Sequence, residues 1–153
     1  MLANELIDCL QKVIFKHFFL GIFAANTIPR KIKDKQFMII NTDYNTGPGK
    51  HWYAIARFKN LIECFDSLGI NSEERKTFIF NHFKFRGTTH VIYNTSQLQP
   101  LSSILCGQFV LYYLFERYHN LDLTFDDLLN EIFNENLSQN DDIVLNFMND
   151  FFH

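Results

Sequence analysis

Four residues in this sequence have the types and order needed for nucleophilic catalysis by a thiol: His51, Asp66, Gln99 and Cys106. A thiol is a weak nucleophile until it ionises, and a nearby imidazole that becomes a cation favours the thiolate. A carboxylate can orient that imidazole, and an amide N–H can donate to an oxygen that becomes negative during acyl transfer. Taken singly, each residue is more often structural, so the hypothesis depends on the set and on the elements that place it.

Cys106 stands at the start of an apolar segment that predicts a helix from about Leu105 to His119. Free backbone N–H groups and the positive end of the helix dipole favour a thiolate at such a position. Gln99 lies in the polar loop that leads to the cysteine, so its amide could join the backbone N–H of Cys106 in an oxyanion hole. Gln97, in the same loop, is the alternative donor.

His51 and Asp66 lie on neighbouring strands of a predicted hairpin. Segments 51–58 and 61–67 have strand character and are separated by only two residues, Lys59-Asn60. A turn of that length makes the two strands antiparallel, so the start of the first lies beside the end of the second. We therefore expect His51 and Asp66 to meet at one edge of the hairpin, where the carboxylate can fix the imidazole tautomer.

The remaining segments complete an α+β fold, a small, mostly antiparallel sheet with helices packed around it, in one domain over 1–153. The further elements that we expect are a helix at 4–18 followed by a loop, strands at 36–42 and 88–94, a helix from a capping box at 71–74 to about Phe85, a helix at 125–133 capped by Thr124, and a last helix from Asn140 or Asp141 to about Phe151. Gly47-Pro48-Gly49 predicts a turn before His51.

The composition sets bounds on the class of protein. A net charge of -3 argues against a strongly basic nucleic-acid binder. The three cysteines, Cys9, Cys64 and Cys106, are an odd number without the spacing of a disulfide framework or a zinc site. No apolar run is long enough to cross a membrane, and the N-terminus does not have the pattern of a signal peptide. We therefore expect an intracellular protein in a reducing compartment, with no membrane partner.

The charge is unevenly distributed along the chain. Residues 1–115 carry 13 Lys and Arg against 8 Asp and Glu, whereas residues 116–153 carry 1 against 9. The predicted loop after the first helix holds a basic run, Arg30, Lys31, Lys33 and Lys35. The simpler interpretation is that the two parts of the chain form solvated surfaces of opposite charge. The alternative is contact of the basic surface with an anionic partner such as DNA.

The segments GKHWYAIARF, ECFDSLG and QPLSSILCGQF resemble the His-Trp, Asp-Ser-x-Gly and Gln…Cys-Gly motifs of the adenain-like cysteine proteases. The same clan includes the Ulp/SENP-type SUMO proteases. The stretches LGIFAANTIPR and FMIINTDYNTGPGKHW resemble the versions found in adenoviruses and in Polinton/Maverick-type DNA elements. The resemblance covers about residues 18–118 and implies a papain-like, adenain-like fold.

Carried over residue by residue, the resemblance implies that Cys106 is the nucleophile, His51 the general base and Asp66 the third member of the triad. Gln99 would be the oxyanion donor, because it precedes the cysteine by seven residues as in adenovirus proteases. Trp52 would help to shape a narrow substrate channel, with a place in the core or the cleft wall as the alternative. No metal or organic cofactor is implied.

The activity implied is a thiol endopeptidase that cleaves after a small, Gly-type residue in viral or virus-like capsid and core precursors during virion maturation. DNA and an activating peptide are candidate partners, as for adenovirus protease. Two alternatives remain. One is an isopeptidase acting on ubiquitin-like modifiers, which is disfavoured by Leu105 where SUMO proteases usually carry Asp. The other is a catalytically silent interaction module, which the intact set of four residues disfavours.

Overall fold

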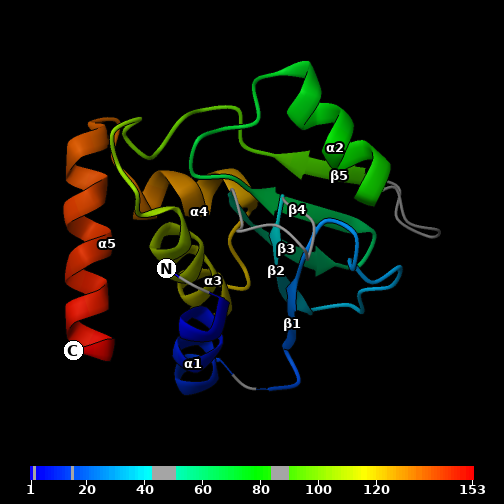
Figure 1. Ribbon diagram of the computed structural model, residues 1–153, viewed down its shortest axis with the longest axis horizontal. Coiled ribbons are helices and arrows are strands. Elements are labelled where there is room, and N and C mark those ends of the chain that lie inside the picture. Colours follow the sequence, from blue (N-terminus) through cyan, green and yellow to red (C-terminus); the bar gives the residue numbers. More distant parts are fainter. Residues whose placement is uncertain (2, 15, 43–50, 84–89) are drawn as a thin grey trace.

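A computed structural model describes residues 1, 3–14, 16–42, 51–83 and 90–153 of the chain (Figure 1). Five strands form one sheet in the order β1-β2-β3-β4-β5, with five helices around it, so the α+β class is confirmed. In chain order the elements are α1 (Ala3–Val13), β1 (Phe19–Phe23), β2 (Phe37–Asn41), β3 (Trp52–Phe58), β4 (Leu61–Phe65), α2 (Glu73–Phe83), β5 (His90–Tyr93), α3 (Cys106–His119), α4 (Phe125–Ile132) and α5 (Leu137–Phe152).

The centre of the sheet is antiparallel and its two outer pairings are parallel. β2 pairs with β3 and β3 with β4 in antiparallel register, while β1 and β5 each add a parallel strand at one edge. The predicted hairpin is present: Phe58 lies opposite Leu61, and Lys59 turns the chain with a φ of 53°. The sheet is therefore more mixed than expected, but the pairing on which the site depends is the expected one.

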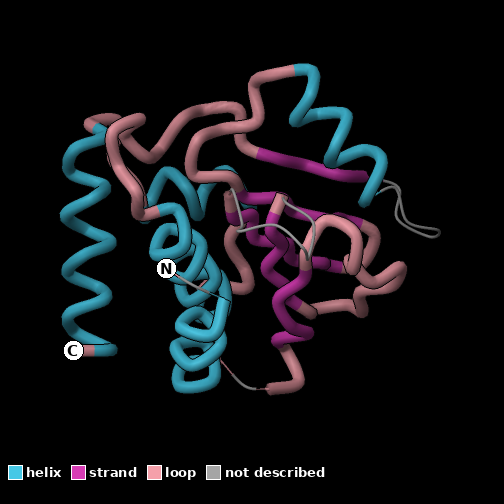
Figure 2. Tube along the Cα trace, viewed as in Figure 1, coloured by secondary structure: helices cyan, strands magenta, loops and turns pink. Residues whose placement is uncertain are grey.

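The helices cover the two faces of the sheet unequally (Figures 1 and 2). α1, α3, α4 and α5 gather on one face, and α2 lies on the other face. The central strands are buried on both faces, because alternate side chains enter two separate apolar clusters. β3 shows this clearly: Ala54 and Ala56 face the four-helix side, whereas Tyr53 and Ile55 face α2. The strand that follows His51 is thus held from both sides.

A buried ion pair fastens α3 to the sheet. Arg117 Nη2 lies 2.7 Å from Glu63 Oε1, and the Tyr113 hydroxyl donates to Glu63 Oε2 at 3.0 Å. Burial raises the pKa of Glu63, while Arg117 and Tyr113 act in the opposite direction. Since α3 begins at Cys106 and β4 leads to Asp66, this contact fixes the two elements that carry the candidate nucleophile and carboxylate.

Two expectations about the ends of the chain were wrong. The predicted helix at 4–18 ends at Val13, and Phe19–Phe23 form an edge strand where a loop was expected. That strand contains a bulge and Gly21 at φ 146°, so it has no regular alternation that a sequence could show. The last helix begins at Leu137, because Asn136 and not Asn140 or Asp141 caps it.

Some predicted features agree, and others fall outside the described residues. Thr124 caps α4 as expected, accepting from the backbone N–H of Asp127 at 3.2 Å. The Gly-Pro-Gly turn at 47–49, the end of the helix predicted to about Phe85 and the first residues of the strand predicted at 88–94 lie outside the described part of the chain. Within that part, no helix is both long and apolar enough to cross a membrane.

Candidate active site

The hairpin brings His51 and Asp66 into contact. The imidazole Nε2 donates to Asp66 Oδ1 at 2.5 Å, and the carboxylate is fully buried while the imidazole is 13% exposed. His51 directly precedes β3 and Asp66 directly follows β4, so their meeting is a consequence of the antiparallel register. This bond leaves the other ring nitrogen, Nδ1, available for a second partner.

The turn after Asp66 holds the carboxylate in place. Leu68 N–H donates to Asp66 Oδ1 at 2.8 Å, and Gly69 N–H donates to the Asp66 carbonyl at 2.9 Å. Gly69 has a φ of 78°, and a Cβ there would lie 2.5 Å from the carbonyl oxygen of Thr95. The Asp-Ser-x-Gly pattern therefore has a local reason, because only glycine fits the last position of this turn.

Cys106 is the first residue of α3, and its thiol lies close enough to the His51 imidazole for the two groups to shift each other's pKa. Burial acts to raise the pKa of the thiol, but the interaction with the charged His51 imidazole outweighs burial, and the backbone N–H groups of Trp52 and Gly107 add to the lowering. The pKa of Cys106 is consequently below its ordinary value.

The imidazole shows the reciprocal effect. Burial acts to lower the pKa of His51, whereas its hydrogen bond to Asp66, its interaction with the Cys106 thiol and the negative charges of both groups raise it to about 9. A lowered thiol pKa beside a raised imidazole pKa is the condition for a thiolate–imidazolium pair near neutral pH.

Trp52 packs against the start of the helix that carries the cysteine. A Cβ on Gly107 would lie 3.5 Å from Trp52 Cδ1 and 3.0 Å from Met1 Cβ. The 3.5 Å distance is ordinary van der Waals contact, so the indole lies against the first turn of α3, and Trp52 is partly buried against the main apolar cluster. This contact gives the His-Trp and Cys-Gly pairs a shared packing role, and the substrate-binding role of Trp52 stays a prediction.

Gln99 lies within the loop before Cys106, with its side chain bound at both ends. Its Oε1 accepts from the Ser67 hydroxyl at 2.6 Å, and its Nε2 donates to the Ser103 carbonyl at 2.9 Å. Gln99 is 2% exposed, and its two side-chain bonds stabilise the conformation of the loop. The alternative donor, Gln97, bonds through its Nε2 to the Gln99 carbonyl at 2.8 Å. The oxyanion role stays a prediction for either residue.

Two residues close to Asp66 were not identified from the sequence, Arg75 and Asn94. Arg75, on α2, donates to the Gly69 carbonyl at 2.7 Å and lies 3.5 Å from Asp66 Oδ2. It also lines, with His51, a pocket of about 350 Å³ whose other walls are Thr42, Tyr53, Glu74 and Phe78. A lone arginine in a polar helix carries no sequence signal of such a contact.

Within the described residues, no group of three or more His, Cys, Asp or Glu could hold a metal ion.

No protein-family model matches this sequence, and no curated protein matches it. Among solved structures, the central domain of an uncharacterized Legionella pneumophila protein matches 99% of this chain and 96% of its own, with a TM-score of 0.55 and 11% identity. An ASFV protease matches 76% of this chain and 44% of its own, with a TM-score of 0.47 and 21% identity. The protease domain of Ulp1, solved in complex with Smt3, the yeast ortholog of SUMO, matches 76% and 54%, with a TM-score of 0.37 and 16% identity. What the chain shares with the Legionella domain is the fold.

Proposed function

We propose that this protein is a cysteine endopeptidase in which Cys106 is the nucleophile, His51 the general base and acid, and Asp66 the residue that orients the imidazole. The observation that carries the proposal is the hydrogen bond of Asp66 with His51 beside Cys106 at the start of α3, with the pKa of the thiol lowered and that of the imidazole raised by their interaction. A structural cysteine in an apolar site would have the opposite shift, as Cys64 does: it is fully buried and its pKa is raised.

The reaction proceeds through a thioester. The Cys106 thiolate attacks the peptide carbonyl carbon, a carbon–sulfur bond forms, and the carbonyl oxygen becomes an oxyanion. The imidazolium of His51 then gives its proton to the leaving amine as the carbon–nitrogen bond breaks. Neutral His51 next takes a proton from water, the resulting hydroxide attacks the thioester, and the acid product leaves as the thiolate is regenerated.

The oxyanion in this scheme accepts from the backbone N–H of Cys106 and from the side-chain amide of Gln99. A primary amide has two N–H groups, and the bond to Ser103 uses one of them. Gln99 also connects the loop of the nucleophile to the turn after Asp66, through its bond with Ser67. Gln99 would therefore act both as brace and as donor, and Gln97 is the second candidate for the donor.

The substrates that we propose are protein or peptide precursors cut after a small, Gly-type residue, including capsid and core proteins of a virus or virus-like element. The support for this is the motif resemblance and the place of Trp52 beside the first turn of α3, where it can narrow the approach to Cys106. Stimulation by DNA or a peptide belongs to the same proposal. The basic residues that would contact DNA, Arg30, Lys31, Lys33 and Lys35, are all exposed.

A thiol-reactive peptide probe tests the enzyme claim directly. A Gly-Gly vinyl sulfone or aldehyde should label Cys106 under reducing conditions, and His51→Ala should lose the labelling while Cys9 remains unlabelled in both. Absence of labelling at Cys106 would overturn the proposal. Cleavage of a modifier–fluorophore conjugate without cleavage of short Gly-Gly peptides would instead identify an isopeptidase, which shares the chemistry but differs in substrate.

A further inference from the structure

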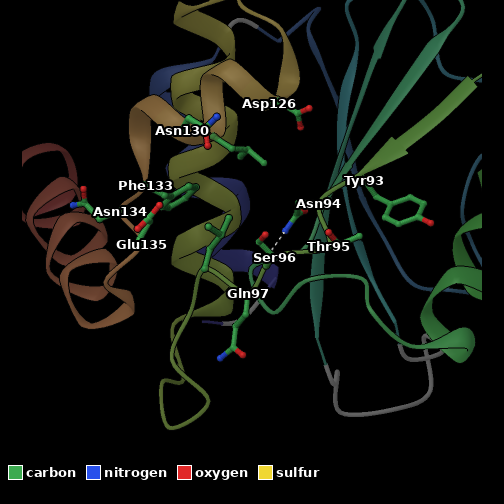
Figure 3. A pocket seen from close by; sticks show the side chains of 12 residues that line it. Tyr93, Asn94, Thr95, Ser96, Gln97, Asp126, Asn130, Phe133, Asn134 and Glu135 are labelled. Carbon is green, nitrogen blue, oxygen red and sulfur yellow. Dashed lines mark hydrogen bonds between the residues drawn. The ribbon is translucent and has the colours of Figure 1, made fainter.

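We propose that Asn94 is a positioning residue that sets the place of the Asp66 carboxylate and so determines how far His51 ionises Cys106. The inference rests on the proposed function, and it concerns a residue outside the triad. Asn94 directly follows β5 and is 7% exposed. It lines a pocket of about 710 Å³ between the loop after β5 and α4 (Figure 3).

The side chain of Asn94 binds both backbone groups of Asp66. The Asp66 N–H donates to Asn94 Oδ1 at 3.0 Å, and Asn94 Nδ2 donates to the Asp66 carbonyl at 2.6 Å. A further bond from Nδ2 to the Ser96 carbonyl at 3.1 Å, drawn in Figure 3, uses the second N–H of the amide. The regular pairing of β4 with β5 ends at Cys64 and Tyr93. Asn94 therefore continues this pairing through its side chain, to the residue that carries the carboxylate.

The residue after Asp66 is tied to the loop of the nucleophile. The Ser67 carbonyl accepts from the backbone N–H groups of Leu98 and Gln99, both at 2.8 Å. The Gln99 side chain links the Ser67 hydroxyl to the Ser103 carbonyl, and the Ser103 hydroxyl accepts from the N–H of Leu105 at 3.3 Å. The next residue in the chain is Cys106. A series of hydrogen bonds, some buried and some partly buried, thus joins the turn after Asp66 to the residue before Cys106 by a route separate from His51.

This arrangement has a consequence for ionisation. The hydrogen bond and charge of Asp66 help to hold the proton on His51, and the resulting imidazolium favours the Cys106 thiolate. If Asp66 moves away from the imidazole by a fraction of an ångström, the imidazole releases its proton at lower pH and less of the thiol is ionised near pH 6. A residue that only supports the fold would not change this balance.

The chain offers a matched control in Asn140. It is fully buried and its side chain also makes three bonds to backbone groups: Asn134 N–H donates to its Oδ1 at 2.7 Å, and its Nδ2 donates to the carbonyls of Leu98 and Asn134, both at 2.9 Å. No bond of this set reaches Asp66. Asn94→Ala and Asn140→Ala therefore remove the same kind of buried amide, and only the first removes contacts with the carboxylate residue.

The experiment measures the rate of alkylation of Cys106 by iodoacetamide from about pH 5 to pH 10, read on the Cys106 peptide by mass spectrometry with the Cys9 peptide as reference. Wild type should react at pH 6 through its thiolate. Asn94→Ala should react about tenfold more slowly at pH 6 but at a similar rate at pH 10, where the thiol is ionised in both proteins. Asn140→Ala should keep the wild-type ratio of the two rates.

An unchanged ratio in Asn94→Ala would overturn the inference and leave Asn94 as a structural residue. A wild-type Cys106 no more reactive than Cys9 at pH 6 would instead overturn the proposed function on which the inference rests. If Asn94→Ala does not fold, judged by near-ultraviolet circular dichroism, Asn94→Ser takes its place. Its hydroxyl can replace only part of the amide's bonding, so a smaller shift in the same direction is expected, and no shift would again overturn the inference.

Discussion

Two buried carboxylates have partners of different chemistry. Glu63 lies on β4, and Asp66 lies in the turn that follows this strand. Glu63 faces α3 and has both oxygens occupied, one by the permanently charged Arg117 and the other by Tyr113. Asp66 faces a titratable imidazole that is partly open to solvent and interacts in turn with a thiol. The first pair can only hold elements together, whereas the second can exchange protons. What distinguishes a structural carboxylate from a candidate catalytic one here is the partner, because burial is nearly the same: Glu63 is 1% exposed and Asp66 0%.

Of the changes around Asp66 and His51, removal of the Cys106 thiol should have the largest effect on activity. Cys106→Ala should abolish turnover of a cleavable peptide and leave the thermal midpoint close to wild type, because one small side chain replaces another. Peptide cleavage and differential scanning fluorimetry provide the two readouts. Cys9→Ala, on α1, is the matched control and should keep full activity. Residual turnover in Cys106→Ala above background would contradict the assignment of the nucleophile.

Isosteric amides at the two carboxylates should separate activity from stability. Asp66→Asn should lower kcat by about 10²- to 10⁴-fold, less than His51→Ala does, because it disturbs the tautomer without removing the base. Glu63→Gln should instead reduce the free energy of unfolding by about 3 kcal/mol, because it leaves Arg117 as a buried charge without its counter-ion. Urea titrations and steady-state kinetics on both variants make the test. Equal losses of kcat in Asp66→Asn and His51→Ala, or a stable Glu63→Gln, would contradict the roles assigned here.

The pH profile gives the finest comparison. Because the pKa of His51 is raised to about 9, turnover should stay high up to that pH and then fall roughly tenfold per unit, as the imidazolium that protonates the leaving amine is lost. The raised pKa of His51 also stabilises the folded state, and this contribution, like turnover, falls at alkaline pH. It is fully present below the unfolded pKa of about 6.5 and is lost as the pH rises through about 9.

Variants at the two carboxylates sharpen that measurement. Asp66→Asn should move the alkaline limb of kcat to lower pH, because the imidazole loses the hydrogen bond and charge that raise its pKa. Glu63→Gln, assayed below its unfolding transition, should leave the limb where it is. A limb that stays near pH 9 in Asp66→Asn would mean that some other group holds the proton on His51.

Local sequence patterns were enough to predict most of the elements and the order in which they carry the candidate residues. The strand character of 51–58 and 61–67, the two-residue turn at Lys59-Asn60 and the apolar run after Cys106 are local signals, and each corresponds to a feature of the structure. The meeting of His51 with Asp66 could be predicted for the same reason, because antiparallel register follows from a tight turn.

The surroundings of those residues became known only from the folded chain. Three of these surroundings depend on residues 28 or more positions apart in the chain. They are the bond of Gln99 with Ser67, the bonds of Asn94 with Asp66, and the salt bridge of Glu63 with Arg117. The edge strand Phe19–Phe23 likewise exists because β2 offers it a partner, since its own sequence has no regular alternation. Such contacts depend on packing between distant segments, and no local pattern of side chains encodes them.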